Sequence, residues 1–196
     1  MMRQTVLKHA LGVERFWYKQ LFAYGEINER TFKVFMRKID NQSYRVSMGM
    51  TQLRAEGEPS GTIWVERLSD LIGRLLPHDS RPAYVQEYLK VRARNIVATR
   101  VLRDLDDLDR IGFLTKSGVI EEVRKTYRAF DSQADASRIE LFEKHRRELL
   151  PIDSHLANKY LALAKMRVLQ ELVDKGTLSQ KIANTLKERI DEELFE

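Results

Sequence analysis

The densest group of carboxylates in the chain is the stretch DLDDLD, residues 104–109. Asp106, Asp107 and Asp109 could in principle surround a cation. A calcium loop, however, needs a glycine turn and a distal glutamate in fixed register, and here leucines interleave at Leu105 and Leu108. That alternation is typical of a solvated helix face. We therefore favour a solvated face over a metal site.

The histidines offer no better set of metal ligands. None of the four is paired at the i, i+3 or i, i+4 spacing that places two ligands on one helical face. They are His9, His78, His145 and His155. Neither a glycine-rich phosphate loop nor a G-x-S-x-G nucleophile motif occurs. The sequence thus predicts no catalytic residue, no metal and no cofactor, and we expect a protein that is not an enzyme.

A basic run is the strongest candidate for a binding surface. It contains no acidic residue between its ends and comprises Lys90, Arg92, Arg94, Arg100 and Arg103. At about 100° per helical residue, Arg92, Arg100 and Arg103 fall within roughly 80° of one another. Such a face suits phosphate, anionic lipid headgroups or an acidic partner, although an ordinary solvated flank explains it too. Aromatic residues do not interleave with the run, which disfavours nucleic acid.

The composition describes the kind of protein that carries these residues. The chain has 196 residues, a mass of 23.0 kDa, 43% hydrophobic and 32% charged residues, and a net charge of +5. It has no cysteine, which excludes disulfides and thiol catalysis and fits a reducing, cytoplasmic setting. Its longest stretch without a charge, residues 46–53, is far too short to span a bilayer. The N-terminal residues lack the features of a signal peptide.

Apolar residues at spacings of three and four predict an all-α protein of six or seven helices, several of them long. The fifth helix is expected to be interrupted at DSQADAS, residues 131–137, and to end before a break at Pro151. The stretch SMGMT, residues 47–51, is placed inside the second helix. The predicted helices cover residues 3–24, 29–56, 63–76, 82–111, 116–150, 153–175 and 180–196.

One spacing recurs three times, with a leucine four residues before a glycine and a capping residue three after it. The turn pairs are Gly25 with Asn28, Gly112 with Thr115, and Gly176 with Ser179. Glycine ends a helix in the left-handed conformation, and the polar residue caps the next one. Each unit therefore predicts an antiparallel helical hairpin. The first and third also share an Ile-Asp ending, although helical hairpins in general look alike.

These stretches resemble the cytoplasmic tails of bacterial and plant-type sodium/proton antiporters of the monovalent cation:proton antiporter superfamily. The resemblance rests on FAYGEINERTFKVFMRKID, YLKVRARNIVATRVLRDLDDLDRIGFLT and MRVLQELVDKGTLSQKIANTLKERIDEEL. The membrane helices that conduct ions in this family have no counterpart here. Its ion-binding aspartates are therefore carried over to no residue of this chain.

The resemblance implies a non-enzymatic cytoplasmic domain that regulates or dimerises a cation/proton antiporter, at the inner face of the plasma membrane. Its partners would be the antiporter's membrane domain, a second copy of the chain and anionic lipid, and pH could bias its packing. The alternative is a standalone helical module that binds an acidic partner or nucleic acid. We expect an N-terminal hairpin, residues 1–57, and a helical bundle, residues 58–196, as two domains or one continuous domain.

Overall fold

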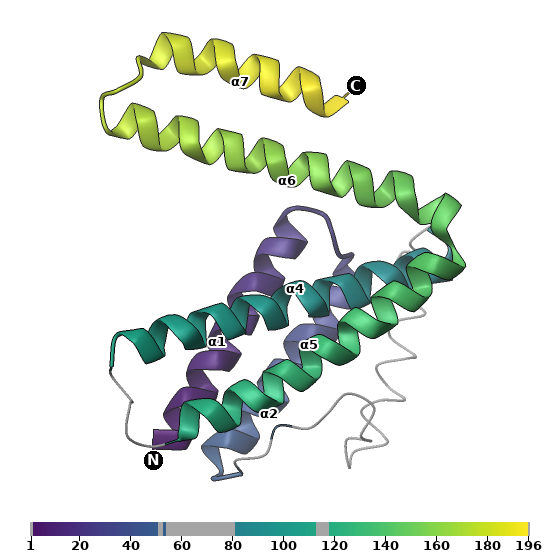
Figure 1. Ribbon diagram of the computed structural model, residues 1–196, viewed down its shortest axis with the longest axis vertical. Helices are drawn as coiled ribbons and strands as arrows, with labels where there is room; N and C mark the ends of the chain where they lie inside the picture. The colour runs from purple at the N-terminus through teal and green to yellow at the C-terminus, as the bar shows by residue number, and fades with distance from the viewer. Residues whose placement is uncertain (1, 51–52, 54–80, 113–117, 196) are drawn as a thin grey trace. The chain divides into compact units, whose positions relative to one another are not determined.

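The computed structural model describes residues 2–50, 53, 81–112 and 118–195, with the backbone alone for 191–195. In these ranges the chain forms six α-helices and no strand, which confirms the predicted all-α fold. The helix predicted at residues 63–76 lies outside the described residues. The helices are α1 Met2–Ala23, α2 Glu29–Ser47, α4 Ala83–Arg110, α5 Val119–Lys144, α6 Arg146–Asp174 and α7 Gln180–Phe195 (Figure 1).

The chain divides into two compact units, Met1–Lys144 and His145–Glu196. In the first unit α1 pairs with α2, α4 pairs with α5, and α1 packs on both α4 and α5. The N-terminal hairpin predicted at residues 1–57 is therefore part of a larger unit that extends to Lys144. The reason is that α1 has two apolar faces, one for α2 and one for the second hairpin.

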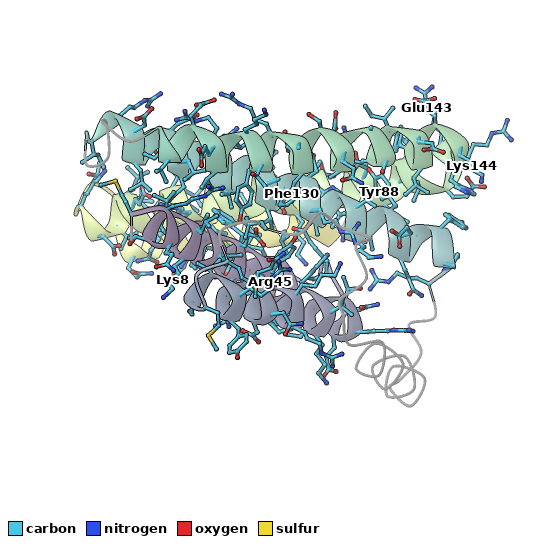
Figure 2. The ribbon with its side chains drawn as sticks, turned by 90° about the horizontal axis from the view of Figure 1, so that it is seen from below. Lys8, Arg45, Tyr88, Phe130, Glu143 and Lys144 are labelled. Atoms are coloured by element: carbon cyan, nitrogen blue, oxygen red, sulfur yellow. The ribbon has the colours of Figure 1, made fainter. Side chains whose placement is uncertain are left out.

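The core of the first unit is built from side chains spaced three or four residues apart along α1, α4 and α5. Its fully buried members include Val6, Ala10, Leu21, Val97, Val101, Leu105, Val123 and Tyr127. Burying one such apolar side chain contributes roughly 1.5–3 kcal/mol. Figure 2 labels a buried residue, Tyr88, and two exposed residues at the end of α5, Glu143 and Lys144.

Glycines in the left-handed conformation end four of the helices. They are Gly25, Gly49, Gly112 and Gly176, with φ of +70°, +85°, +73° and +68°. After Gly25 and Gly176, the next backbone N–H bonds back to Leu21 and Leu172, each at 2.9 Å, which is the Schellman arrangement.

Side chains at two of the predicted capping positions bond to the following helix. Asn28 Oδ1 accepts a hydrogen bond from Thr31 N–H at 2.8 Å, and Ser179 Oγ lies 3.5 Å from the amide of Ile182. The predicted cap Thr115 lies outside the described residues.

The second helix ends earlier than predicted. Gly49 has φ of +85°, and Met50 N–H bonds to Arg45 O at 3.0 Å, so α2 stops at Ser47. The prediction that SMGMT lies inside this helix is wrong, because Gly49 ends α2 by the same Schellman arrangement.

Two predicted interruptions are also wrong. DSQADAS is continuous helix within α5, since Ala134 is buried and Asp131 is bonded to α4. Pro151 lies inside α6, and the actual break falls at His145. Because α6 begins at Arg146, only about one turn precedes the proline, which removes a single backbone hydrogen bond there.

The second unit is the α6–α7 hairpin. A small core of Ala162, Leu169 and Ile190 joins its two helices. Met166, Leu178 and Leu186 pack against this core and are partly buried. None of the helices described in either unit combines the length and apolar character that a bilayer span needs.

Candidate functional site

The predicted basic run lies on α4, but its side chains are engaged in contacts within the first unit. Arg92 Nη1 donates to Glu26 Oε2 at 2.6 Å, and the two side chains are only 14% and 5% exposed. Glu26 follows the helix-ending Gly25, so this ion pair joins α4 to the turn between α1 and α2. Removing one partner of such a pair leaves a charge buried and is costly.

Two further arginines of the run lie over aromatic rings of the first hairpin. The guanidinium of Arg100 is 4.4 Å from the ring centroid of Trp17 on α1. That of Arg94 is 5.8 Å from the ring of Phe35 on α2. Each such contact contributes roughly 0.5–2 kcal/mol. These residues thus hold the two hairpins together.

The remaining members of the run lie at the surface. Lys90 Nζ is 3.0 Å from Glu87 Oε2, one helical turn earlier, and Arg103 is exposed. The fold therefore does not gather the five residues into one free basic surface. The partners of Arg92, Arg94 and Arg100 come from distant segments of the chain, so spacing along α4 alone could not reveal them.

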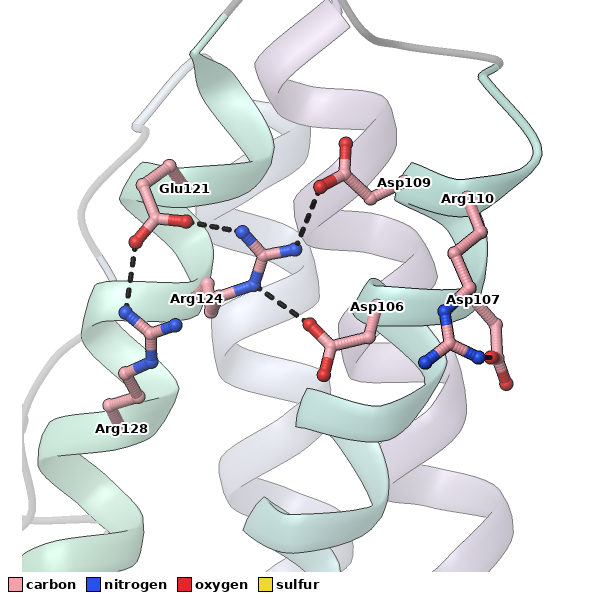
Figure 3. Close-up of polar contacts among 7 residues, drawn as sticks. All are labelled: Asp106, Asp107, Asp109, Arg110, Glu121, Arg124 and Arg128. Carbon is pink, nitrogen blue, oxygen red and sulfur yellow. Dashed lines mark hydrogen bonds and ion pairs between the residues drawn. The ribbon is translucent and has the colours of Figure 1, made fainter.

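The acidic stretch at the end of α4 is bound by an arginine that sequence reasoning missed. Arg124 on α5 lies 3.0 Å from Asp106 and 3.1 Å from Asp109, and it also donates to Glu121 (Figure 3). Its side chain is only 11% exposed. Arg128 continues the network, with its Nη1 2.9 Å from Glu121 Oε1. Arg124 therefore joins the C-terminal end of α4 to the N-terminal end of α5.

This network shifts the pKa values of Glu121 and Arg124 in opposite directions. The hydrogen bond and positive charge of Arg124 lower the pKa of Glu121, and Arg128 adds to the effect. The hydrogen bond to Glu121 raises the pKa of Arg124. Both shifts favour the charged form of the group. Because the pKa of Glu121 is lowered in the folded state, its stabilising contribution is lost as the pH falls below 4.5.

The other acidic residues of the stretch also have basic partners. Asp104 contacts His9 on α1, and Asp107 lies 3.6 Å from Arg110. Among the described residues no group of three or more histidines and carboxylates could hold a metal ion. The predicted solvated face is thus a set of ion pairs, three of which join α4 to its neighbours.

Hydrogen bonds from uncharged side chains to carboxylates join the helices further from the turn. Asp131 on α5 accepts hydrogen bonds from Asn95 Nδ2 and Thr99 Oγ1 of α4, both at 3.0 Å. Tyr127 is 1% exposed and donates its hydroxyl to Glu14 on α1. Burial, and then the charge of Glu14, raise the pKa of Tyr127 well above 10.0. These contacts fix the register of three helices.

Most of the polar contacts described above, those of Arg92, Arg100, Arg124, Asp131 and Tyr127 among them, connect one element of the first unit to another. Comparison with protein-family models, with curated proteins and with solved structures finds no match.

Proposed function

We propose that the chain is a non-enzymatic cytoplasmic domain that regulates and dimerises a cation/proton antiporter. It would act at the inner face of the plasma membrane, with the antiporter's membrane domain as its partner. Its hairpins would dock on one another and on that partner, and pH would act by favouring one packing over another.

The observation that carries this proposal is the repeated hairpin. Gly25 and Gly176 end α1 and α6 with nearly equal φ and the same pair of backbone hydrogen bonds. The resemblance to antiporter tails rests on these two hairpin segments together with YLKVRARNIVATRVLRDLDDLDRIGFLT. Two similar docking modules in one chain suit a protein that joins other polypeptides.

The alternative, a module that binds an acidic partner or nucleic acid, depends on a free basic surface. Its support is weaker because Arg92, Arg94 and Arg100 contact residues of the first hairpin. Contact with anionic lipid would rest mainly on Arg103 and on the net charge.

Transport measurements test the proposal directly. The genomic frame upstream of this sequence, and the neighbouring genes, would first be read for an antiporter. Sodium-driven proton movement would then be measured in everted membrane vesicles with the antiporter alone and with the chain present. We expect the chain to shift the pH dependence of transport. Identical transport profiles with and without it would contradict a regulatory role.

A further inference from the structure

The α6–α7 hairpin repeats the α1–α2 hairpin beyond its turn. When the two hairpins are aligned at Gly25 and Gly176, the apolar residues that join the two helices of each hairpin fall at equivalent positions. These pairs are Leu11 with Ala162, Tyr18 with Leu169, Phe35 with Leu186, and Ile39 with Ile190, and all are buried or partly buried. The two hairpins are therefore held together by equivalent faces.

The first helix of the N-terminal hairpin has a second apolar face, formed by Val6, Ala10, Val13 and Trp17. Val6 and Ala10 are 1% and 0% exposed. Trp17 on this face packs under Arg100 of α4, while Glu14 beside it accepts the hydroxyl of Tyr127 on α5. This face is the one that α1 uses to dock on α4 and α5.

The equivalent face of α6 is exposed. It consists of Ala157, Leu161, Ala164 and Val168, with Leu161 and Val168 exposed at 57% and 54%. Leu150 extends the row at its N-terminal end and is 52% exposed. The alternating spacing of four and three residues is that of a coiled-coil seam. An exposed row of mainly apolar residues of this kind marks an interaction surface.

The partner of this row differs from that of α1. In α1 and the turn after it, four residues make specific contacts with α4 and α5, and the aligned residues of the second hairpin do not preserve these contacts. Arg3, Glu14, Trp17 and Glu26 align with Ser154, Lys165, Val168 and Thr177. What remains is an uncharged, mainly apolar row of six residues: Leu150, Ser154, Ala157, Leu161, Ala164 and Val168. Such a row can pair with the same row of a second copy in the antiparallel direction.

We propose that α6 pairs antiparallel with α6 of a second copy of the chain, so that two α6–α7 hairpins form a four-helix bundle. Leu161 then faces Ala157 of the second copy, Leu150 faces Val168, and Ser154 faces Ala164. The Leu161–Ala157 layer pairs a large side chain with a small one, Leu150 and Val168 bring two large apolar side chains together at each end of the seam, and Ser154 meets Ala164, so every layer avoids a charged side chain. A two-fold axis makes the same surface serve both copies.

Charge favours the same orientation. Asp153 and Arg167 lie on one flank of the row, seven residues on either side of Tyr160. In an antiparallel pair with its two-fold axis near Tyr160, Asp153 of each copy lies opposite Arg167 of the other. In an in-register parallel pair Leu161 would meet Leu161, and Asp153 could not reach Arg167, which lies fourteen residues further along the chain. The proposal rests on the homodimer of the proposed function and gives it a surface and an orientation.

Light scattering on the purified full chain tests the surface. We expect a dimer whose dissociation constant rises by about 30-fold or more in Leu161→Glu, because the substitution places two charges at the centre of the seam. Ile182→Glu is the matched control: Ile182 is 53% exposed and lies on α7, off the row. Circular dichroism would verify that both variants keep their helices. A monomeric wild-type chain, or equal dimerisation of the two variants, overturns the proposal.

Cysteine cross-linking tests the orientation, and the chain has no native cysteine to interfere. We expect Leu150→Cys mixed with Val168→Cys to form a disulfide-linked dimer, whereas each variant alone does not. Cross-linking of Leu150→Cys with itself would show a parallel pair and overturn the antiparallel arrangement. Neither experiment measures transport, so loss of the dimer surface and loss of antiporter regulation are separately observable.

Discussion

Arg124 illustrates how one side chain connects two helices by charge. It is nearly buried, yet it lies within 3.1 Å of Asp106 and Asp109 on α4 and donates to Glu121 on α5. Its three carboxylate partners are each about half exposed, so water partly screens them. The network therefore stabilises the protein mainly because several partners together hold Arg124 in one position.

We expect Arg124→Met to lower the free energy of unfolding by about 1–3 kcal/mol, because α4 and α5 lose their shared cation. The matched control is Arg128→Met, which removes a charge from the same network at a side chain that is 60% exposed. That control should cost less than about 1 kcal/mol. Urea unfolding followed by circular dichroism measures both, and equal losses would contradict the central role of Arg124.

Tyr127 is the residue whose titration is most strongly affected by the fold. Its raised pKa means that the folded protein keeps the hydroxyl proton after the unfolded chain has released it near pH 10. Its contribution to stability is thus complete below pH 10 and is lost as the pH rises above that value.

We expect the stability of the protein to fall above pH 10, and Tyr127→Phe to reduce that slope by about 1.4 kcal/mol per pH unit. At neutral pH the same variant should cost roughly 1 kcal/mol, because Glu14 loses this donor. Thermal unfolding from pH 7 to 11 checks both effects. Tyr44→Phe, at a tyrosine that is 64% exposed, serves as the control. An unchanged alkaline slope in Tyr127→Phe would contradict the assignment.

At the scale of the elements, helix ends that depend on neighbouring residues could be predicted from the sequence, whereas contacts between distant segments could not. Glycine and a capping residue specify a helix end within a few positions, which is why the turn at Gly25 and Asn28 was predictable. The basic run was interpreted as a possible binding surface or a solvated flank, because its partners Glu26, in the turn after α1, and Trp17, on α1, are distant in the sequence. Similarly, continuity through residues 131–137 depends on Asn95 and Thr99, which bond Asp131 from α4.

An added methyl group should lower the stability of the protein at a glycine that ends a helix and raise it at a glycine within a helix. We expect Gly176→Ala to destabilise the protein by about 1 kcal/mol, because its φ of +68° strains an L-residue although no neighbouring atom lies within 4 Å of the added methyl group. Gly12→Ala, within α1 and equally unobstructed, should instead stabilise it by roughly 0.5–1 kcal/mol. Thermal unfolding distinguishes the two, and equal signs would contradict the explanation.

At the scale of the whole molecule, the two units differ in how much core they bury. The first unit has a core contributed by α1, α2, α4 and α5, whereas the second joins two helices around Ala162, Leu169 and Ile190. Domains of about 50 residues are marginally stable by themselves. The second unit therefore has the greater need of a partner.

We expect hydrogen exchange to be slower for the amides of α4 than for those of α6 and α7 in dilute solution. Protection of α6 should increase with protein concentration, since burial of Leu161 and Val168 in a dimer removes them from water. Protection of α4 should not depend on concentration. Exchange monitored by mass spectrometry at two concentrations measures this difference. Concentration-independent protection of α6 would contradict a dimer formed through this helix.

The glycine that ends α6 also has a consequence for chirality. At φ of +68° Gly176 has the conformation that a residue of opposite handedness adopts without strain. A D-alanine at this position, introduced by chemical ligation of a synthetic C-terminal peptide, would keep the turn and reduce the freedom of the unfolded chain. The L- and D-alanine proteins would then have the same composition and opposite effects on stability.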